Sequence, residues 1–153
     1  MGSVCAVTML MCFQAAVATP AEAEAKPQAL HEHPTIVRMW HRNNELRSRV
    51  GLRAQRLCPR LTRAAQDHAW FMARTRSFSH HSNGGPMGRA HRYGYTGMVS
   101  ENIAMGQRDA AAAVHAWMTS NAGHCENIMN GSWNVVGVGY AAPYWTLKLA
   151  SAK

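Results

Sequence analysis

The chain has 153 residues, a length typical of one domain built around a single hydrophobic core. Apolar residues make up 47% and charged residues 16%, which excludes a disordered chain and a multispan membrane protein. The formal net charge is +8, and 13 of the 16 basic residues are arginines, since the lysines are Lys26, Lys148 and Lys153. We therefore expect a soluble globular protein that is attracted to acidic surfaces.

The arginines are spread from Arg38 to Arg108 and are not interleaved with aromatic residues along one element. This distribution favours a solvated helix face over a phosphate-binding track, so we expect no nucleic-acid partner. Anionic lipid or an anionic cell-wall polymer fits the charge better, because attraction to either needs no base-reading motif.

Residues 4–18 form an apolar run that is too short to span a bilayer and is typical of a signal-peptide core. Ala16, Val17 and Ala18 supply the small-x-small cleavage pattern, but no basic residue precedes Lys26, so a buried N-terminal helix is the alternative. We expect an extracytoplasmic protein, secreted or periplasmic, with no transmembrane span in the mature chain. Its expected parts are a signal peptide over 1–18, a flexible linker over 19–34 and one domain over 35–150.

Cleavage near Ala18 would remove Cys5 and Cys12 and leave Cys58 and Cys125 as the remaining thiols. In an exported protein two such cysteines are expected to form a disulfide. The alternative is two unpaired cysteines, because a sequence does not show whether the two Cα atoms come within bonding distance.

The first predicted element is a helix from Thr35 to about Val50, with apolar residues three and four apart and Gly51 in the position of a C-terminal cap. A second helix is predicted from about Pro59 to Arg74. His68 falls on its apolar face and is expected to be a hydrogen-bonded core histidine.

Residues 82–98 hold five glycines and are expected to be mainly loop. Asp109 is expected to cap a helix over 110–120. Two β-rich segments, 135–140 and 144–149, predict an antiparallel hairpin with a tight turn between them. Helices followed by strands indicate an α+β fold with helices packed on a sheet.

Common catalytic and nucleotide-binding motifs are absent from the sequence. Polar residues instead gather at the ends of predicted elements, in Phe78-Ser79-His80, in Ser100-Glu101-Asn102-Ile103 and in Gly123-His124-Cys125-Glu126-Asn127-Ile128.

The order of these segments resembles the CAP superfamily of cysteine-rich secretory proteins, antigen 5 and pathogenesis-related proteins, in its compact bacterial branch with SCP-like extracellular domains. The resemblance covers about residues 38 to 149. It rests on Asn44-x-x-Arg47 with Gly51-Leu52, LTRAAQDHAWFMA, FSH, GRAHRYGY, ENIAMG, a tryptophan-bearing helix, GHCENIMN, and VVGVGY with YWT. It implies a three-layer α-β-α sandwich with a C-terminal antiparallel hairpin and a shallow cleft that carries two histidines and two acidic residues.

By this resemblance the cleft histidines are His80 and His124, and the first glutamate is Glu101. Ser120 stands in the place of the second glutamate. Two imidazoles and a carboxylate suit Zn²⁺ or another divalent cation. The alternative is that His80, Glu101 and His124 form a hydrogen-bonded network without an ion.

Three functions follow from the residues and the resemblance. The first is a secreted binding module whose cleft takes a small ligand or lipid and holds a metal at His80, Glu101 and His124. The second is a weak, protease-like hydrolase in which Ser79, Ser100 or Ser120 acts as nucleophile beside His80 or His124. The third is a cationic protein that associates with the cell envelope through its arginines.

Overall fold

The computed structural model describes residues 29–152, so the expected signal peptide over 1–18 and most of the expected linker over 19–34 lie outside the described residues. The last residues of that linker range belong to the fold. Leu30–Glu32 forms a 3-10 turn, η1, and Leu30 packs against the hydrophobic core.

The centre of the fold is a sheet of four strands in the order β1-β3-β4-β2. Its strands are β1 (Arg56–Leu57), β2 (Val99–Met105), β3 (Val135–Ala141) and β4 (Tyr144–Ala150). β4 pairs antiparallel with both β2 and β3, which confirms the predicted C-terminal hairpin, and β1 pairs parallel with β3. β2 is therefore an edge strand.

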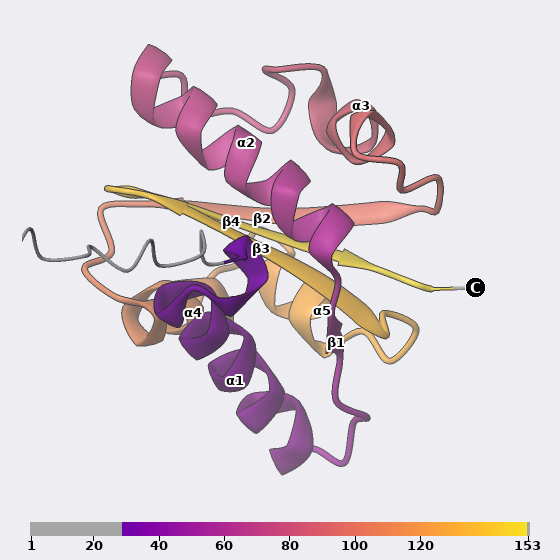
Figure 1. Ribbon diagram of the computed structural model, residues 1–153. Coiled ribbons are helices and arrows are strands. Elements are labelled where there is room, and N and C mark those ends of the chain that lie inside the picture. The colour runs from indigo at the N-terminus through magenta and orange to yellow at the C-terminus, as the bar shows by residue number, and fades with distance from the viewer. Residues whose placement is uncertain (1–28, 153) are drawn as a thin grey trace, which may run out of the picture.

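Helices cover both faces of the sheet, as Figure 1 shows. α2 (Pro59–Thr75) and α3 (Gly85–Arg92) lie on one face. α1 (Pro34–Arg49), α4 (Ala110–Met118) and α5 (His124–Met129) lie on the other. The expected three-layer α-β-α sandwich is confirmed.

Local sequence explains the ends of two helices that were predicted. α1 ends at Arg49, and Gly51 follows with a φ of +73°, a conformation that favours glycine. At the start of α4, the Asp109 carboxylate accepts a hydrogen bond from the amide of Ala112 at 2.8 Å. Both cap predictions are confirmed.

α2 packs directly on β3. A Cβ atom at Gly137 would overlap the carbonyl carbon of Leu61, and one at Gly139 would overlap that of Ala65. The glycines of β3 therefore let the backbones of helix and strand approach each other.

Arg47 ties α1 to the end of α5. Its buried guanidinium donates to the carbonyl oxygens of Ile128 at 2.6 Å, Asn130 at 3.0 Å and Trp133 at 3.2 Å. These bonds fix the end of α5, the helix that begins at His124.

The expectation that 82–98 is mainly loop was wrong, because α3 occupies Gly85–Arg92. Its glycines delimit a short helix: Gly84 precedes it with φ of +80° and Gly94 follows it with φ of +74°.

Among residues 29–152, no helix combines the length and apolar character needed to cross a membrane.

Candidate functional site

Glu101 on β2 is the centre of a buried ionic cluster, with a side chain that is 1% exposed. Arg89 on α3 donates from Nη2 to both carboxylate oxygens, at 2.7 Å and 2.8 Å. Lys148 on β4 donates from Nζ to Oε2 at 2.6 Å. Two buried cations therefore share one carboxylate.

The charges of this cluster oppose the effect of burial. Burial alone would raise the pKa of Glu101, but the hydrogen bond from His80 and the charges of Lys148 and Arg89 outweigh it and hold the pKa at about 2. Burial lowers the pKa of Lys148 to about 8 in spite of the nearby carboxylate. At neutral pH Glu101 is ionised, and Lys148 is still mostly protonated.

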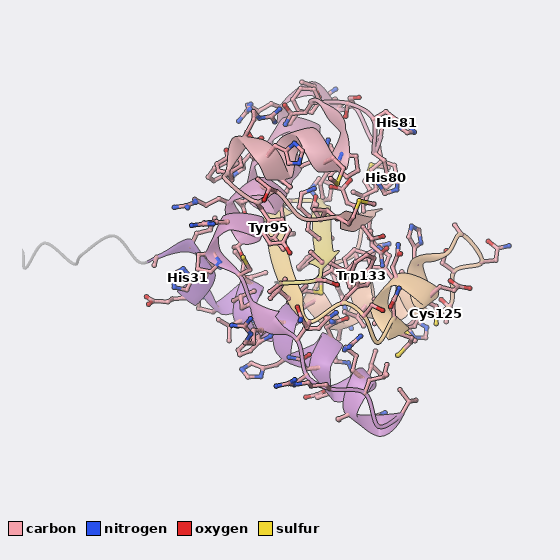
Figure 2. The ribbon with its side chains drawn as sticks, turned by 90° about the vertical axis from the view of Figure 1, so that its right-hand side faces the viewer. His31, His80, His81, Tyr95, Cys125 and Trp133 are labelled. Atoms are coloured by element: carbon pink, nitrogen blue, oxygen red, sulfur yellow. The ribbon has the colours of Figure 1, made fainter. Side chains whose placement is uncertain are left out.

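His80 lies in the loop that leads from α2 to α3, where Figure 2 labels it. Its Nδ1 lies 3.0 Å from Oε1 of Glu101, and its backbone oxygen accepts a hydrogen bond from Arg89 at 3.1 Å. The carboxylate orients the imidazole and leaves Nε2 for other partners.

His68 is in the core as expected, but it is not hydrogen-bonded. Neither ring nitrogen has a partner among the described residues, and Nε2 lies 3.9 Å from Oε1 of Glu101. Burial lowers the pKa of His68 to about 4, so the ring is neutral at pH 7. The expected hydrogen bond was wrong because α2 turns this ring toward Glu101, whose oxygens already bind stronger donors.

A second hydrogen-bonded pair of side chains lies on the other face of β2. Ser120, just after α4, and His124, at the start of α5, are joined by a hydrogen bond of 2.9 Å between Oγ and Nδ1. Burial lowers the pKa of His124, and the charge of His80 lowers it further.

Neighbouring residues of β2 position the two pairs, because successive side chains of a strand point to opposite faces. Glu101 bonds to His80 on one side. On the other side, Asn102 donates to the carbonyl oxygen of His124 at 2.9 Å, and Asn127 donates to Asn102 at 2.8 Å. One edge strand thus anchors both histidines.

A groove of about 260 Å³ runs along β2 beside His124. Phe78 and Met105, which are 46% and 49% exposed, border it, and Ser120 and His124 bring polar groups to it. Its other lining residues are Ile103, Ala104, Gln107, Ala116 and Trp117. A mostly apolar groove that ends in an imidazole and a hydroxyl can take an apolar group together with a hydrogen-bonding one.

The donor set does not fit a metal held by His80, Glu101 and His124 together. Both oxygens of Glu101 already accept hydrogen bonds from Arg89, Lys148 or His80. Within residues 29–152, no group of three or more His, Cys, Asp or Glu side chains is arranged to hold a metal ion. The carboxylate instead orients His80, and the two imidazoles remain as potential ligands.

The expected disulfide is absent, since both Cys58 and Cys125 are free thiols. Cys58 lies at the start of α2 and packs with Leu61 on one face of the sheet, whereas Cys125 lies in α5 on the other face (Figure 2). The sheet therefore separates the two thiols.

The sequence does not identify two residues of the cluster, Lys148 and Arg89, as parts of the site. Lys148 had a signal, because it is a charged residue inside an apolar strand and shares a strand face with Thr146. Arg89 lies in the GRAHRYGY motif, but the glycine-rich stretch around it predicts a loop and gives no sign that this arginine is buried.

Comparison with known proteins adds to this geometry. A sequence profile of the cysteine-rich secretory protein family, CAP, matches residues 40–143. The uncharacterized protein YkwD of Bacillus subtilis is 31% identical over 137 residues, which cover 83% of this chain and 52% of the relative. The chain therefore spans about half the length of that relative.

Solved structures of bacterial proteins are similar in fold. An extracellular protein from Bacillus anthracis that contains an SCP domain superposes with a TM-score of 0.73 at 26% identity, covering 76% of this chain and 40% of that one. An outer surface protein from Borrelia burgdorferi gives a TM-score of 0.71 at 21% identity, with 78% of this chain and 93% of that one covered.

Proposed function

This chain belongs to the cysteine-rich secretory protein family, in its bacterial branch, and we propose that it is an extracytoplasmic binding module whose ligand lies in the groove along β2. The observation that supports this proposal is the groove of about 260 Å³, which has apolar walls and is also lined by Ser120 and His124. The location outside the cytoplasm is supported by the descriptions of the similar structures as extracellular and outer surface proteins.

The ligand class follows from the lining. Phe78, Met105 and Trp117 offer an apolar surface, while His124 is neutral at pH 7 because its pKa is lowered. A small, mainly apolar ligand, or the chain of a lipid, with one uncharged hydrogen-bonding group fits this surface. The buried cluster around Glu101 has a different task, because it holds His80 at the edge of the strand.

Filling the groove tests the proposal. The probe is N-phenyl-1-naphthylamine, an uncharged dye whose fluorescence rises in an apolar site. We expect Ala116→Phe, which places a ring in the groove, to remove most of the dye binding. Ala111→Phe on the exposed side of the same helix is the matched control and should leave it unchanged. Equal binding by both variants would show that the dye, and by inference the ligand, binds elsewhere.

Zinc binding stays a prediction, and no step of the proposed function passes through a metal. The two imidazoles would hold Zn²⁺ weakly, and Ser120→Glu would add an acidic ligand beside His124. Titration calorimetry should then show tighter binding by Ser120→Glu and loss of binding by His124→Ala. Uptake that is the same in His124→Ala and the wild type would place the ion outside the cleft.

A hydrolase is the second candidate, favoured by the bond between Ser120 and His124 at 2.9 Å. A neutral imidazole can accept the serine proton, which is the first requirement of a nucleophilic serine. Among the described residues, however, no acidic group orients the other ring nitrogen of His124. A fluorophosphonate that labels Ser120 in the wild type but not in His124→Ala would support this candidate, and absence of labelling would exclude an activated serine.

A further inference from the structure

A second cavity lies at the far end of α2 and is larger than the groove, at about 480 Å³. The start of α2, the loop after α3 and the residues after β4 line this open cavity. Its lining residues are Cys58, Pro59, Arg60, Arg63, Gly94, Tyr95, Thr96, Gly97, Ser151 and Ala152. It shares no residue with the groove, and Figure 2 shows Tyr95 apart from His80.

The charged groups at this cavity are all positive. Arg60 and Arg63 line it, and no acidic residue does. Arg60 donates to the carbonyl oxygen of Gly94 at 3.2 Å, which holds one guanidinium at the rim. Arg63 makes no hydrogen bond or ion pair within the described part of the chain, so its guanidinium is available to a ligand.

The start of α2 adds to this positive field. The first turn contains no acidic residue, and the Cys58 side chain makes no capping hydrogen bond. The N-terminus of a helix of 17 residues therefore contributes its partial positive charge at the cavity beside the two arginines.

The remaining wall is apolar. Cys58, Tyr95 and Ala152 pack against a buried cluster that includes Leu61 and Ala90. The Tyr95 hydroxyl is already engaged, because it donates to the carbonyl oxygen of Ser151 at 2.7 Å. The cavity thus joins a cationic rim to an apolar wall.

We propose that this cavity binds a small amphiphilic anion. The acidic head, a carboxylate or a phosphate, pairs with Arg60 and Arg63, and the short apolar body lies against Tyr95 and Ala152. The volume falls within the range of small-molecule sites in proteins. This site is independent of the groove along β2, so it holds whether or not the groove binds a ligand.

The thiol of Cys58 gives a direct readout, because it lines the cavity and is free. The full-length protein is alkylated with the uncharged reagent N-ethylmaleimide, and modification of each cysteine is followed by peptide mass spectrometry. Octanoate and octyl phosphate are the anionic probes, and 1-octanol is the uncharged control. Cys125, on the opposite face of the sheet, is the internal reference thiol.

We expect both anions to slow alkylation of Cys58 and to leave Cys125 unchanged, while 1-octanol at the same concentration has no effect. The difference between the two anions shows whether carboxylate or phosphate is preferred. Arg63→Gln should weaken protection by about tenfold, the loss of one charge-assisted hydrogen bond. Arg74→Gln, an exposed change near the other end of α2, should not weaken it.

Three results would overturn the proposal. They are no protection by either anion, equal protection by 1-octanol, and unchanged protection in the double variant Arg60→Gln, Arg63→Gln. The dye measurement on the groove distinguishes the two sites, because Ala116→Phe should not alter protection of Cys58.

Discussion

At the scale of single residues, Glu101 is the common partner of the buried charged groups in its cluster. It is the shared partner of two buried cations, Arg89 and Lys148, and it also orients His80. Removing its charge leaves both cations in the protein interior without an anion, and an uncompensated buried charge is more costly than the loss of a surface pair.

We therefore predict that Glu101→Gln lowers the free energy of unfolding by about 3 to 5 kcal/mol, although Gln keeps the size of the side chain. Urea denaturation at pH 7 measures this change. Glu126→Gln, at an exposed residue, is the matched control and should lie within about 0.5 kcal/mol of the wild type. Similar midpoints for both variants would mean that the cluster does not stabilise the fold.

A second prediction concerns His68 and the dependence of stability on pH. Its pKa is about 4 in the folded protein, below the 6.5 of a free histidine, so the unfolded chain binds more protons between these values. The contribution of neutral His68 to the free energy of unfolding is therefore fully present above pH 6.5. It falls by up to about 3 kcal/mol as the pH drops toward 4. His68→Leu should remove this loss and keep or raise stability at pH 7, because neither ring nitrogen has a hydrogen bond to lose.

Urea denaturation at pH 7, 5.5 and 4.5 tests this expectation, with His91→Leu at an exposed residue as the control. An equal acid-induced loss in wild type and His68→Leu would show that other groups carry it. Glu101 acts in a lower window, since its pKa of about 2 means that its contribution is lost only below about pH 4.5.

The site was predictable only in part at this scale. The resemblance singled out His80, Glu101, Ser120 and His124, and the structure joins them as two hydrogen-bonded pairs, His80 with Glu101 and Ser120 with His124. A set of three metal ligands assumes that Glu101 is free to bind an ion. Whether the carboxylate is free depends on whether cationic side chains bind it. That is decided by the tertiary packing of α3 and β4 and not by spacing in the chain.

At the scale of elements, α2 and β3 approach each other closely at Gly137 and Gly139. A side chain at Gly137 would meet the backbone of Leu61, which cannot give way without moving the helix. We predict that Gly137→Ala lowers the free energy of unfolding by about 3 kcal/mol or more, at the upper end of the range for overpacking.

Gly88 provides the matched control for that substitution. It lies in α3, where an added Cβ atom meets nothing within 4 Å, and its φ is not positive. Gly88→Ala should therefore raise stability by roughly 0.5 to 1 kcal/mol. The midpoint temperatures of thermal unfolding should shift in opposite directions in the two alanine variants. A shift of both midpoints in the same direction would contradict the packing argument.

Periodicity predicted the long elements but not the short ones. The two long helices, the helix after Asp109 and the C-terminal hairpin have clear apolar patterns, and the structure contains them. β2 lacks such a pattern, because its polar side chains point to both faces and are satisfied by distant residues. α5, with six residues, is too short for an apolar pattern to identify it.

At the scale of the whole molecule, the net charge of +8 lies mostly on exposed arginines around both helical layers. Arg38 and Arg49 on α1 and Arg53 after it are exposed, whereas Arg47 is buried and holds α5. The groove along β2 is flanked by neutral or internally paired groups. Surface charge and groove are therefore separate features, and different ligands should report on each.

We predict that the protein binds vesicles of phosphatidylglycerol through these exposed arginines and binds vesicles of phosphatidylcholine much more weakly. Binding should fall steeply as salt is raised from about 0.05 M to about 0.5 M, because the screening length becomes shorter than the spacing of surface charges. The triple variant Arg38→Gln, Arg49→Gln, Arg53→Gln should reduce vesicle sedimentation, and His80→Ala should not. The opposite result, loss of binding in His80→Ala and no change in the triple variant, would place the membrane contact at the cleft. Binding that does not depend on three surface charges requires a specific site for the lipid headgroup.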